Sequence, residues 1–389
     1  MLEPLQNQRG IALDERPKAA AAIGRILESA DIKLNGRNPW DVQILNVRAL
    51  DRVTGEGSLG LGESYMDGWW ECESLDQFFD RIFRADLNKK IKIHDLILGM
   101  MSRFRNLQSR RRAVQVANSH YNIGNDFFAS MLDSSMTYTC GYWKQANSLE
   151  EAQIAKLDLV CKKLGLERGM RVLDIGCGWG SFSKYAAEEY GVSCVGITNS
   201  KEQASLATQR TSGLPVEFRL TDYRAFNKKG DEKFDRVCSI GMFEAVGHKN
   251  FKTFFQMARR SLTDDGVFLL HTIGRKRWKF APDPWFDRYI FPNGELPSLD
   301  QISRSASDYF VIEDLHNFGA DYDRTLMAWY EKFEASWPRF CDQYGERFYR
   351  MWKYYLLAMA GCFRARETQL WQIVLSPNGI GGGYCRPEQ

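Results

Sequence analysis

Residues 171–182 constrain the fold of this chain more than any other stretch, because a buried strand there ends in a glycine-rich turn. The strand is apolar and its glycines follow at alternate positions: Val172, Leu173 and Ile175, then Gly176, Gly178 and Gly180. Glycine is needed where the backbone takes a positive φ or lies against a ligand. Asp174 stands two residues before the first glycine. This order favours a site for S-adenosylmethionine (SAM), with Asp174 and the three glycines as cofactor-binding residues.

Two other nucleotide sites fit the same stretch poorly. It lacks the GxGxxG spacing that seats a pyrophosphate on a helix N-terminus, and it lacks the Gly-Lys-Ser/Thr of a P-loop. Alternate glycines also occur in ordinary strand-to-helix turns. The rest of the chain therefore has to support the SAM interpretation.

Strands and helices alternate after the turn, which predicts an α/β fold. The expected helices cover 181–190, 201–210 and 251–262, and the expected strands cover 192–198, 216–221, 234–240 and 267–273. Such a rhythm is typical of a Rossmann-like, doubly wound parallel sheet with its ligand at the carboxyl ends of the strands. Two later strands, 311–315 and 368–375, bracket two aromatic-rich helices at 323–343 and 346–364. These helices suit either a core or the wall of a pocket for a long apolar ligand.

Polar side chains stand where several of these strands end. They are Thr198 and Gln203, Asp222 and Tyr223, and Glu244, with His271 on the strand 267–273. Because the carboxyl ends of parallel strands share one edge of a sheet, we expect these side chains to line one cleft.

Composition excludes several classes of protein. The net charge is only +3, which argues against a nucleic-acid partner, and the nine cysteines have no CxxC or zinc spacing, which argues against a metal site. The residues after Met1 resemble no signal peptide, and no apolar run approaches the roughly 18 residues of a membrane span. The expected location is cytoplasmic.

Two stretches of the first 113 residues stand out. The glycine run 55–63 has no buried strand before it and no lysine after it, so we expect a mobile loop. Residues 81–113 hold ten Lys or Arg and two Asp, a net charge of +8, with apolar residues at helical spacing. That pattern fits a basic amphipathic helix on an anionic membrane surface, or equally a docked helix that links two domains.

Eight motifs together resemble the cyclopropane-fatty-acyl-phospholipid synthases, a family similar to the mycolic-acid cyclopropane synthases. The motifs lie at residues 57–71, 120–126, 138–140, 172–180, 241–244, 270–274, 317–323 and 363–366. The resemblance covers about residues 20–376. It implies a class I SAM-dependent methyltransferase domain at 114–389 behind a smaller, lipid-contacting N-terminal domain at 1–113. It also implies peripheral association with the inner face of a membrane, and it is compatible with a homodimer.

The implied reaction adds the methyl carbon of SAM across the cis double bond of an unsaturated phospholipid acyl chain. An alkene needs no prior deprotonation, so the reaction calls for no Ser-His-Asp or Cys-His arrangement. Methyl transfer leaves a carbocation, which a dry aromatic pocket protects from water. A base then removes a proton from the delivered methyl, and the ring closes.

The resemblance also implies the site residues. Bound bicarbonate is the implied base, and the residues implied to hold it are Cys140, Glu244, His271, Ile273 (through its backbone) and Tyr322. The residues implied to contact SAM are Tyr138, Thr139, Gly176, Gly178, Thr198, Gln203, Asp222 and Tyr223. The chain departs from the usual family pattern at Ala245, where many members have His, and at Met359, where many have Cys.

Two other functions stay open at this point. A SAM-dependent N-methyltransferase acting on a small amine can share the same core, and so can a catalytically silent protein that binds SAM and lipid. The set formed by Cys140, Glu244, His271 and Tyr322 favours the cyclopropane reaction, because an amine acceptor does not require it. The sequence does not define the preferred acyl chain, the head group or the position of the double bond.

Overall fold

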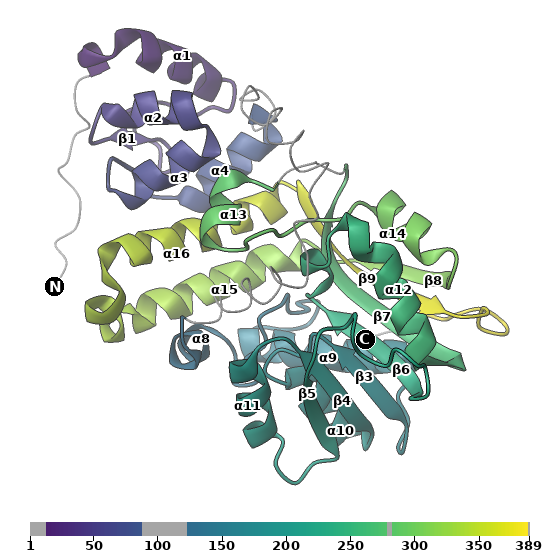
Figure 1. Ribbon diagram of the computed structural model, residues 1–389. Coiled ribbons are helices and arrows are strands. Elements are labelled where there is room, and N and C mark those ends of the chain that lie inside the picture. Colours follow the sequence, from purple (N-terminus) through teal and green to yellow (C-terminus); the bar gives the residue numbers. More distant parts are fainter. Residues whose placement is uncertain (1–12, 88–122, 278–281, 388–389) are drawn as a thin grey trace.

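A seven-stranded sheet forms the centre of the larger part of the molecule (Figure 1). The computed structural model describes residues 13–87, 123–277 and 282–387. The strand order is β5-β4-β3-β6-β7-β9-β8. The strands are β3 (Arg171–Ile175), β4 (Ser193–Thr198), β5 (Val216–Leu220), β6 (Phe234–Ile240), β7 (Leu262–Arg275), β8 (Val311–Asn317) and β9 (Thr368–Ser376).

The five strands from β3 to β7 run parallel, while β9 is antiparallel to both β7 and β8. The expected α/β sheet is therefore confirmed, with an antiparallel end that the βαβ rhythm alone did not predict. Strand β7 also begins at Leu262, five residues before the expected start, because Leu262 pairs with Phe234 ahead of a register shift.

Side chains alternate between the two faces of the sheet, so each face has its own apolar core. Leu173 and Ile175 of β3 pack with residues of α12 (Phe251–Ser261) and α14 (Leu299–Ala306). Val172 packs on the other face with residues of α9 (Leu149–Leu164) and α10 (Ser181–Tyr190). The helix α11 (Lys201–Arg210) follows β4 and, like α10, begins and ends where the sequence predicts.

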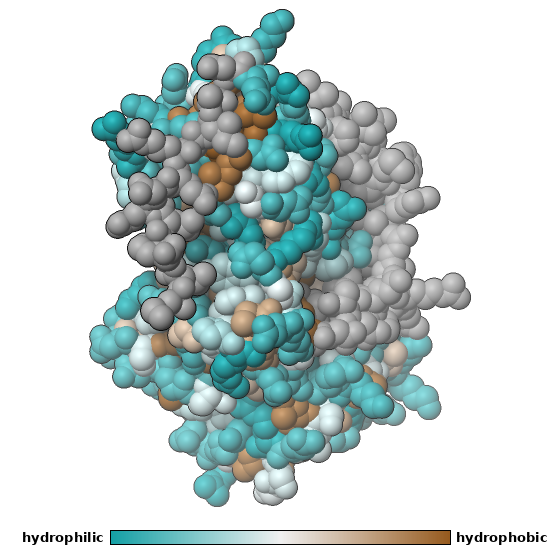
Figure 2. Space-filling view, turned by 90° about the vertical axis from the view of Figure 1, so that its left-hand side faces the viewer, coloured by the Kyte–Doolittle hydropathy of each residue, from teal (hydrophilic) through white to brown (hydrophobic). Residues whose placement is uncertain are grey.

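Within residues 13–87, the N-terminal layer contains four α-helices and a two-stranded antiparallel sheet. The helices are α1 (Pro17–Glu28), α2 (Arg48–Glu56), α3 (Ser58–Met66) and α4 (Leu75–Arg84), and the small sheet pairs β1 (Gln43–Ile44) with β2 (Trp70–Glu71). Figure 2 shows hydrophobic side chains gathered in the upper half of one face, at the height of these helices in Figure 1.

The expected mobile loop at 55–63 is wrong, because most of it is helical. Gly57 has φ 60° and separates α2 from α3. A Cβ at Gly60 would lie 2.2 Å from the carbonyl oxygen of Arg52, and a Cβ at Gly62 would lie 2.2 Å from the ring of Trp285. These glycines therefore serve close packing, and tertiary contacts outweigh their poor helix propensity.

Two long helices, α15 (Asp321–Ser336) and α16 (Cys341–Arg364), lie side by side between the N-terminal layer and the sheet (Figure 1). A Cβ at Gly361 would lie 2.5 Å from the carbonyl oxygen of Asp76, so the glycine lets α4 approach α16 closely. Arg364 fixes this junction, with nitrogens 2.6 Å from an Asp76 oxygen and 2.8 Å from an Asp323 oxygen.

Most of the basic segment 81–113 lies outside the described residues, which resume at 123. Within the described part, Arg81 and Arg84 belong to α4. No helix in the three described ranges is long and apolar enough to cross a membrane. The same ranges contain no group of three His, Cys, Asp or Glu that could hold a metal ion.

Candidate active site

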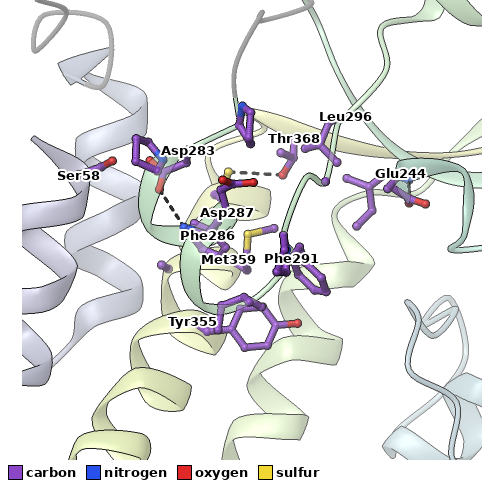
Figure 3. Close-up of a pocket in the computed structure, with 18 of the residues that line it drawn as sticks. Ser58, Glu244, Asp283, Phe286, Asp287, Phe291, Leu296, Tyr355, Met359 and Thr368 are labelled. Carbon is purple, nitrogen blue, oxygen red and sulfur yellow. Dashed lines mark hydrogen bonds between the residues drawn. The ribbon is translucent and has the colours of Figure 1, made fainter. Parts of the chain in front are cut away.

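A cavity of about 790 Å³ connects the carboxyl ends of the central strands with the N-terminal helices. One end is polar and includes the glycine turn after β3, whereas the other is walled by apolar side chains such as Leu27 and Val53. Figure 3 shows part of the space between these ends. The residues labelled there come from α3, α13 (Pro284–Tyr289) and the residues on either side of it, α16, the start of β9 and the segment after β6.

Eight of the residues expected to contact SAM line this cavity together. They are Tyr138, Thr139, Gly176, Gly178, Thr198, Gln203, Asp222 and Tyr223. Gly176 and Gly178 have φ of 82° and 53°, so the turn depends on glycine. A Cβ at Gly176 would lie 2.6 Å from Met242, while a Cβ at Gly178 would meet nothing within 4 Å. Gly178 therefore presents bare backbone to the open cavity.

The polar end is ordered by its own hydrogen bonds. Thr198 Oγ1 donates to Gln203 Oε1 at 2.9 Å. Asp222 accepts two hydrogen bonds from the guanidinium group of Arg224, at 2.8 and 2.6 Å, and a third from the Arg224 backbone N–H at 2.8 Å. The hydroxyl of Tyr223 is buried and has no hydrogen-bond partner among the described residues.

Asp174 and Gly180 do not line the cavity. The Asp174 carboxylate is buried behind the turn, where it accepts hydrogen bonds from Ser183 Oγ at 3.0 Å and Cys238 Sγ at 3.7 Å. Burial raises its pKa to about 6, and these two donors act in the opposite direction. A Cβ at Gly180 would lie 2.7 Å from Phe218. Both residues support the turn from behind, so their expected contact with SAM stays a prediction.

Glu244 lies on the short 3₁₀ helix η2 (Phe243–Ala245), which follows β6, and lines the cavity. Its Oε1 accepts a 2.6 Å hydrogen bond from the backbone N–H of Ile273. Its Oε2 is buried without a partner among the described residues. Burial raises the pKa of Glu244 to about 7, although the Ile273 N–H favours the charged form. The carboxyl group therefore exchanges a proton near neutral pH.

His271 lies two residues before Ile273 on β7 and is 1% exposed. Its Nδ1 is 3.2 Å from the side-chain nitrogen of Gln372, and its Nε2 has no partner among the described residues. Burial lowers its pKa well below 6.5, and the nearby Lys156 and Lys163 lower it further. The ring is therefore neutral at physiological pH.

Cys140 and Tyr322 come from two different segments of the chain, and both lie near Thr325. Cys140 is fully buried, with Sγ 3.8 Å from Thr325 Oγ1, and burial raises its pKa well above 9. Tyr322 lies three residues before Thr325 on α15 and stacks on Phe363 with ring centroids 4.4 Å apart. Of the five expected catalytic residues, Glu244, Ile273 and Tyr322 line the cavity, whereas Cys140 and His271 do not.

The backbone beside Ala245 is hydrogen-bonded to a later segment of the chain. His248 Nδ1 is 2.8 Å from Glu295, and the Glu295 N–H donates to the Glu244 carbonyl at 2.8 Å. The backbone that carries Glu244 is thus hydrogen-bonded to the segment 291–296, which also lines the cavity.

Sequence reasoning missed the helix α13 and the segment that follows it. Asp283 caps α13 by accepting from the N–H groups of Trp285 and Phe286, and Phe286 and Phe291 face the cavity (Figure 3). The run Pro282–Asp287 carries a usable signal, because an Asp-Pro helix start precedes two aromatic residues.

Comparison with known proteins agrees with the resemblance that the sequence motifs show. The sequence pattern of the family described as mycolic acid cyclopropane synthetase matches residues 108–373. The chain is 53% identical to the cyclopropane-fatty-acyl-phospholipid synthase of Escherichia coli (strain K12), over 92% of this chain and 93% of that protein.

Two solved structures of related enzymes are also similar. The cyclopropane synthase MmaA2 from Mycobacterium tuberculosis is 31% identical, with a TM-score of 0.63, over 70% of this chain and 99% of that chain. The mycolic acid cyclopropane synthase CmaA1, complexed with SAH and CTAB, is 34% identical, with a TM-score of 0.63, over 67% of this chain and 97% of that chain.

Proposed function

Because this chain belongs to the family of mycolic acid cyclopropane synthetases and is a SAM-dependent methyltransferase, we propose that it cyclopropanates unsaturated phospholipid acyl chains. The methylene carbon comes from SAM, and bound bicarbonate serves as the base. One observation carries the proposal most strongly. Glu244, whose buried Oε2 has no partner among the described residues, lines a cavity whose walls include both the glycine turn and a long apolar surface.

The polar end of the cavity fits SAM. Gly176 and Gly178 would lie against the cofactor, since a Cβ at Gly178 would project into open space. Thr198, Gln203, Asp222 and Tyr223 add hydroxyl, amide and carboxylate groups around the same volume. When bound, SAM supplies the electrophilic methyl group.

Two buried polar atoms without hydrogen-bond partners among the described residues could bind a small oxyanion that carries a hydroxyl group. Glu244 Oε2 and His271 Nε2 are buried without partners among the described residues, and each can accept or donate one hydrogen bond according to its protonation. Cys140 and Tyr322 would complete the set with a thiol and a phenol. Bicarbonate held there would supply the base that accepts a proton from the transferred methyl. Glu244 orients it, and the Ile273 N–H holds Glu244 in place.

The apolar part of the cavity suits an acyl chain and a cationic transition state. Phe286, Phe291, Tyr355 and Met359 surround this part of the cavity (Figure 3). Aromatic faces stabilise a carbocation, and apolar walls exclude the water that would capture it. Cys140 is held as a neutral thiol, so no thiolate nucleophile competes with the alkene.

We also propose the two-domain organisation that is expected from the sequence. Residues 1–113 would contact lipid, and residues 114–389 would carry out the chemistry. The net charge of +8 in residues 81–113 supports attraction to an anionic bilayer. The enzyme would then act peripherally at the inner face of a membrane.

A labelling experiment tests the proposed substrate. Purified protein receives methyl-labelled SAM and vesicles of one phospholipid with cis-monounsaturated chains, while a matched sample receives the saturated phospholipid. We expect label in the unsaturated lipid alone. Equal labelling of both lipids, or labelling of an amine-containing head group, would reject transfer to the double bond.

A further inference from the structure

Lys156 is a buried lysine with no part in the proposed methylene transfer. It lies on α9 and is 1% exposed. Its Nζ donates to Thr139 Oγ1 at 2.9 Å, and this is its only hydrogen bond among the described residues. A buried ammonium group is costly unless it is paired with an opposite charge and hydrogen-bonded. Thr139 lines the polar end of the cavity, so the lysine supports that end from behind.

The chemistry of the two groups fixes the direction of the contact. An ammonium group has donors and no acceptor, so Thr139 Oγ1 must accept from Lys156. The threonine hydroxyl has one proton of its own, and that proton finds no acceptor among the described residues. Thr139 is therefore prepared to donate one hydrogen bond to a ligand in the cavity.

Two further contacts fix the position of Thr139. Gln153, three residues before Lys156 on α9, donates from its side chain to the Thr139 carbonyl at 2.7 Å. On the other side, a Cβ at Gly241 would lie 2.5 Å from the Thr139 methyl group. Helix α9 thus holds both the backbone and the hydroxyl of this residue.

We propose that Lys156 is a positioning residue for SAM, which it serves by committing the Thr139 hydroxyl to donate to the cofactor's carboxylate. The inference rests on the SAM site proposed above. SAM offers several acceptors, but the carboxylate is its one anionic group, so the buried cation behind Thr139 favours that end. A chain from ammonium to hydroxyl to carboxylate is a charge-assisted arrangement, in which each bond strengthens the next.

The charges around Lys156 make this arrangement sensitive to pH. Burial lowers the pKa of Lys156 to about 8, while Asp133, Asp174, Cys140 and Cys238 act to raise it. The neighbouring His271 is neutral. A bound carboxylate would stabilise the ammonium form, so SAM should bind with proton uptake above pH 8 and lose affinity as the pH rises through that value.

Calorimetry with two ligands separates this role from a merely structural one. S-adenosylhomocysteine keeps the carboxylate, whereas 5′-methylthioadenosine lacks the whole amino-acid part. For Lys156→Met we expect the affinity for S-adenosylhomocysteine to fall about tenfold or more. The affinity for 5′-methylthioadenosine should change less than about twofold. Lys156→Arg should retain part of the discrimination.

Substitutions of Thr139 provide a second test that changes the side chain less. Thr139→Ser keeps the hydroxyl and should bind both ligands like the wild type, whereas Thr139→Val should reproduce the selective loss. The two losses should not add in the double variant, because both act through one chain. This series also tests the inference if Lys156→Met does not fold.

Two results would overturn the inference. They are an equal loss of both ligands in the variants, or unchanged binding of S-adenosylhomocysteine in Thr139→Val. If the wild type itself fails to bind S-adenosylhomocysteine, the SAM site falls together with this inference. Normal wild-type binding without selectivity in the variants rejects Lys156 alone.

Discussion

The backbone N–H of Ile273 donates a 2.6 Å hydrogen bond to Oε1 of Glu244, and this contact joins the strand β7 to the helix that follows β6. It leaves Oε2 of the same carboxyl buried without a partner among the described residues. One oxygen is thus fixed by the fold, and the hydrogen-bonding capacity of the other is unused by the described residues.

Glu244→Gln should therefore impair the chemical step far more than the binding of SAM. The substitution keeps the volume and removes the charge that organises the proposed base. We expect turnover to fall by about two to four orders of magnitude, the usual size of a lost proton-transfer contribution. Steady-state kinetics and SAM calorimetry measure the two effects.

Bicarbonate depletion provides the control for this variant. It should slow the wild type, and bicarbonate added back should restore the wild type better than Glu244→Gln. Full activity of the depleted wild type, together with weakened SAM binding in the variant, would make Glu244 a cofactor ligand only.

The raised pKa of Glu244 also predicts how stability depends on pH. Folding raises this pKa from 4.5 to about 7, so the fold favours the protonated carboxyl. That contribution is fully present below pH 4.5 and is lost as the pH rises towards and through 7. Glu244→Gln cannot ionise, so its stability relative to the wild type should increase over this range, by up to about 3 kcal/mol. Urea unfolding at pH 5 and pH 8, in bicarbonate-free buffer, measures the difference. A difference that is the same at both pH values would show that the carboxyl is not held in an apolar site.

Gly178→Ala should abolish the binding of SAM while leaving the fold in place. Its Cβ would project into the open cavity, where the cofactor is proposed to lie. Gly379→Ala is a matched control, because Gly379 also has a positive φ and open space around it but does not line the cavity. Both variants should lose about 1 kcal/mol of stability from backbone strain. Equal SAM affinity in the two variants would place the cofactor elsewhere.

Replacing Arg110, Arg111 and Arg112 with Gln should weaken binding to anionic vesicles by up to about 3 kcal/mol, if all three lie near the surface. Raised salt should weaken wild-type binding in the same direction. The matched control removes three charges elsewhere, at the exposed residues Lys228, Lys229 and Arg304. Co-sedimentation that is unchanged in the first variant, or reduced equally in both, would mean that the basic segment is not the membrane contact.

The sequence predicted the α/β part of the fold well, because its signals are local. Helix α10 and strand β6 have the expected limits, since hydrophobic period and glycine turns define such elements directly. The glycine run 55–63 was predicted wrongly. The contacts that make it helical join Gly60 to Arg52 and Gly62 to Trp285, and single-residue propensity does not contain them.

The sequence predicted which residues belong to the site, but not which of them are buried behind the cavity wall. Motif resemblance led to Glu244 and Tyr322, yet the burial of Asp174, Cys140 and His271 behind the cavity wall depends on side-chain direction. Lys156 and Gln153 were missed for a related reason. A polar residue among apolar neighbours is a visible signal, but only the folded helix α9 aligns both with Thr139.

In the proposed reaction, the transferred carbon bridges the double bond after losing one proton. The most direct measurement supplies SAM whose methyl carbon carries only deuterium to a monounsaturated phospholipid and analyses the product by mass spectrometry and NMR. We expect the lipid to gain one carbon with two deuterium atoms, in a cyclopropane ring, while the third deuterium is lost to the base. A product that retains all three deuterium atoms in a methyl group, on carbon or on nitrogen, would rule out cyclopropanation.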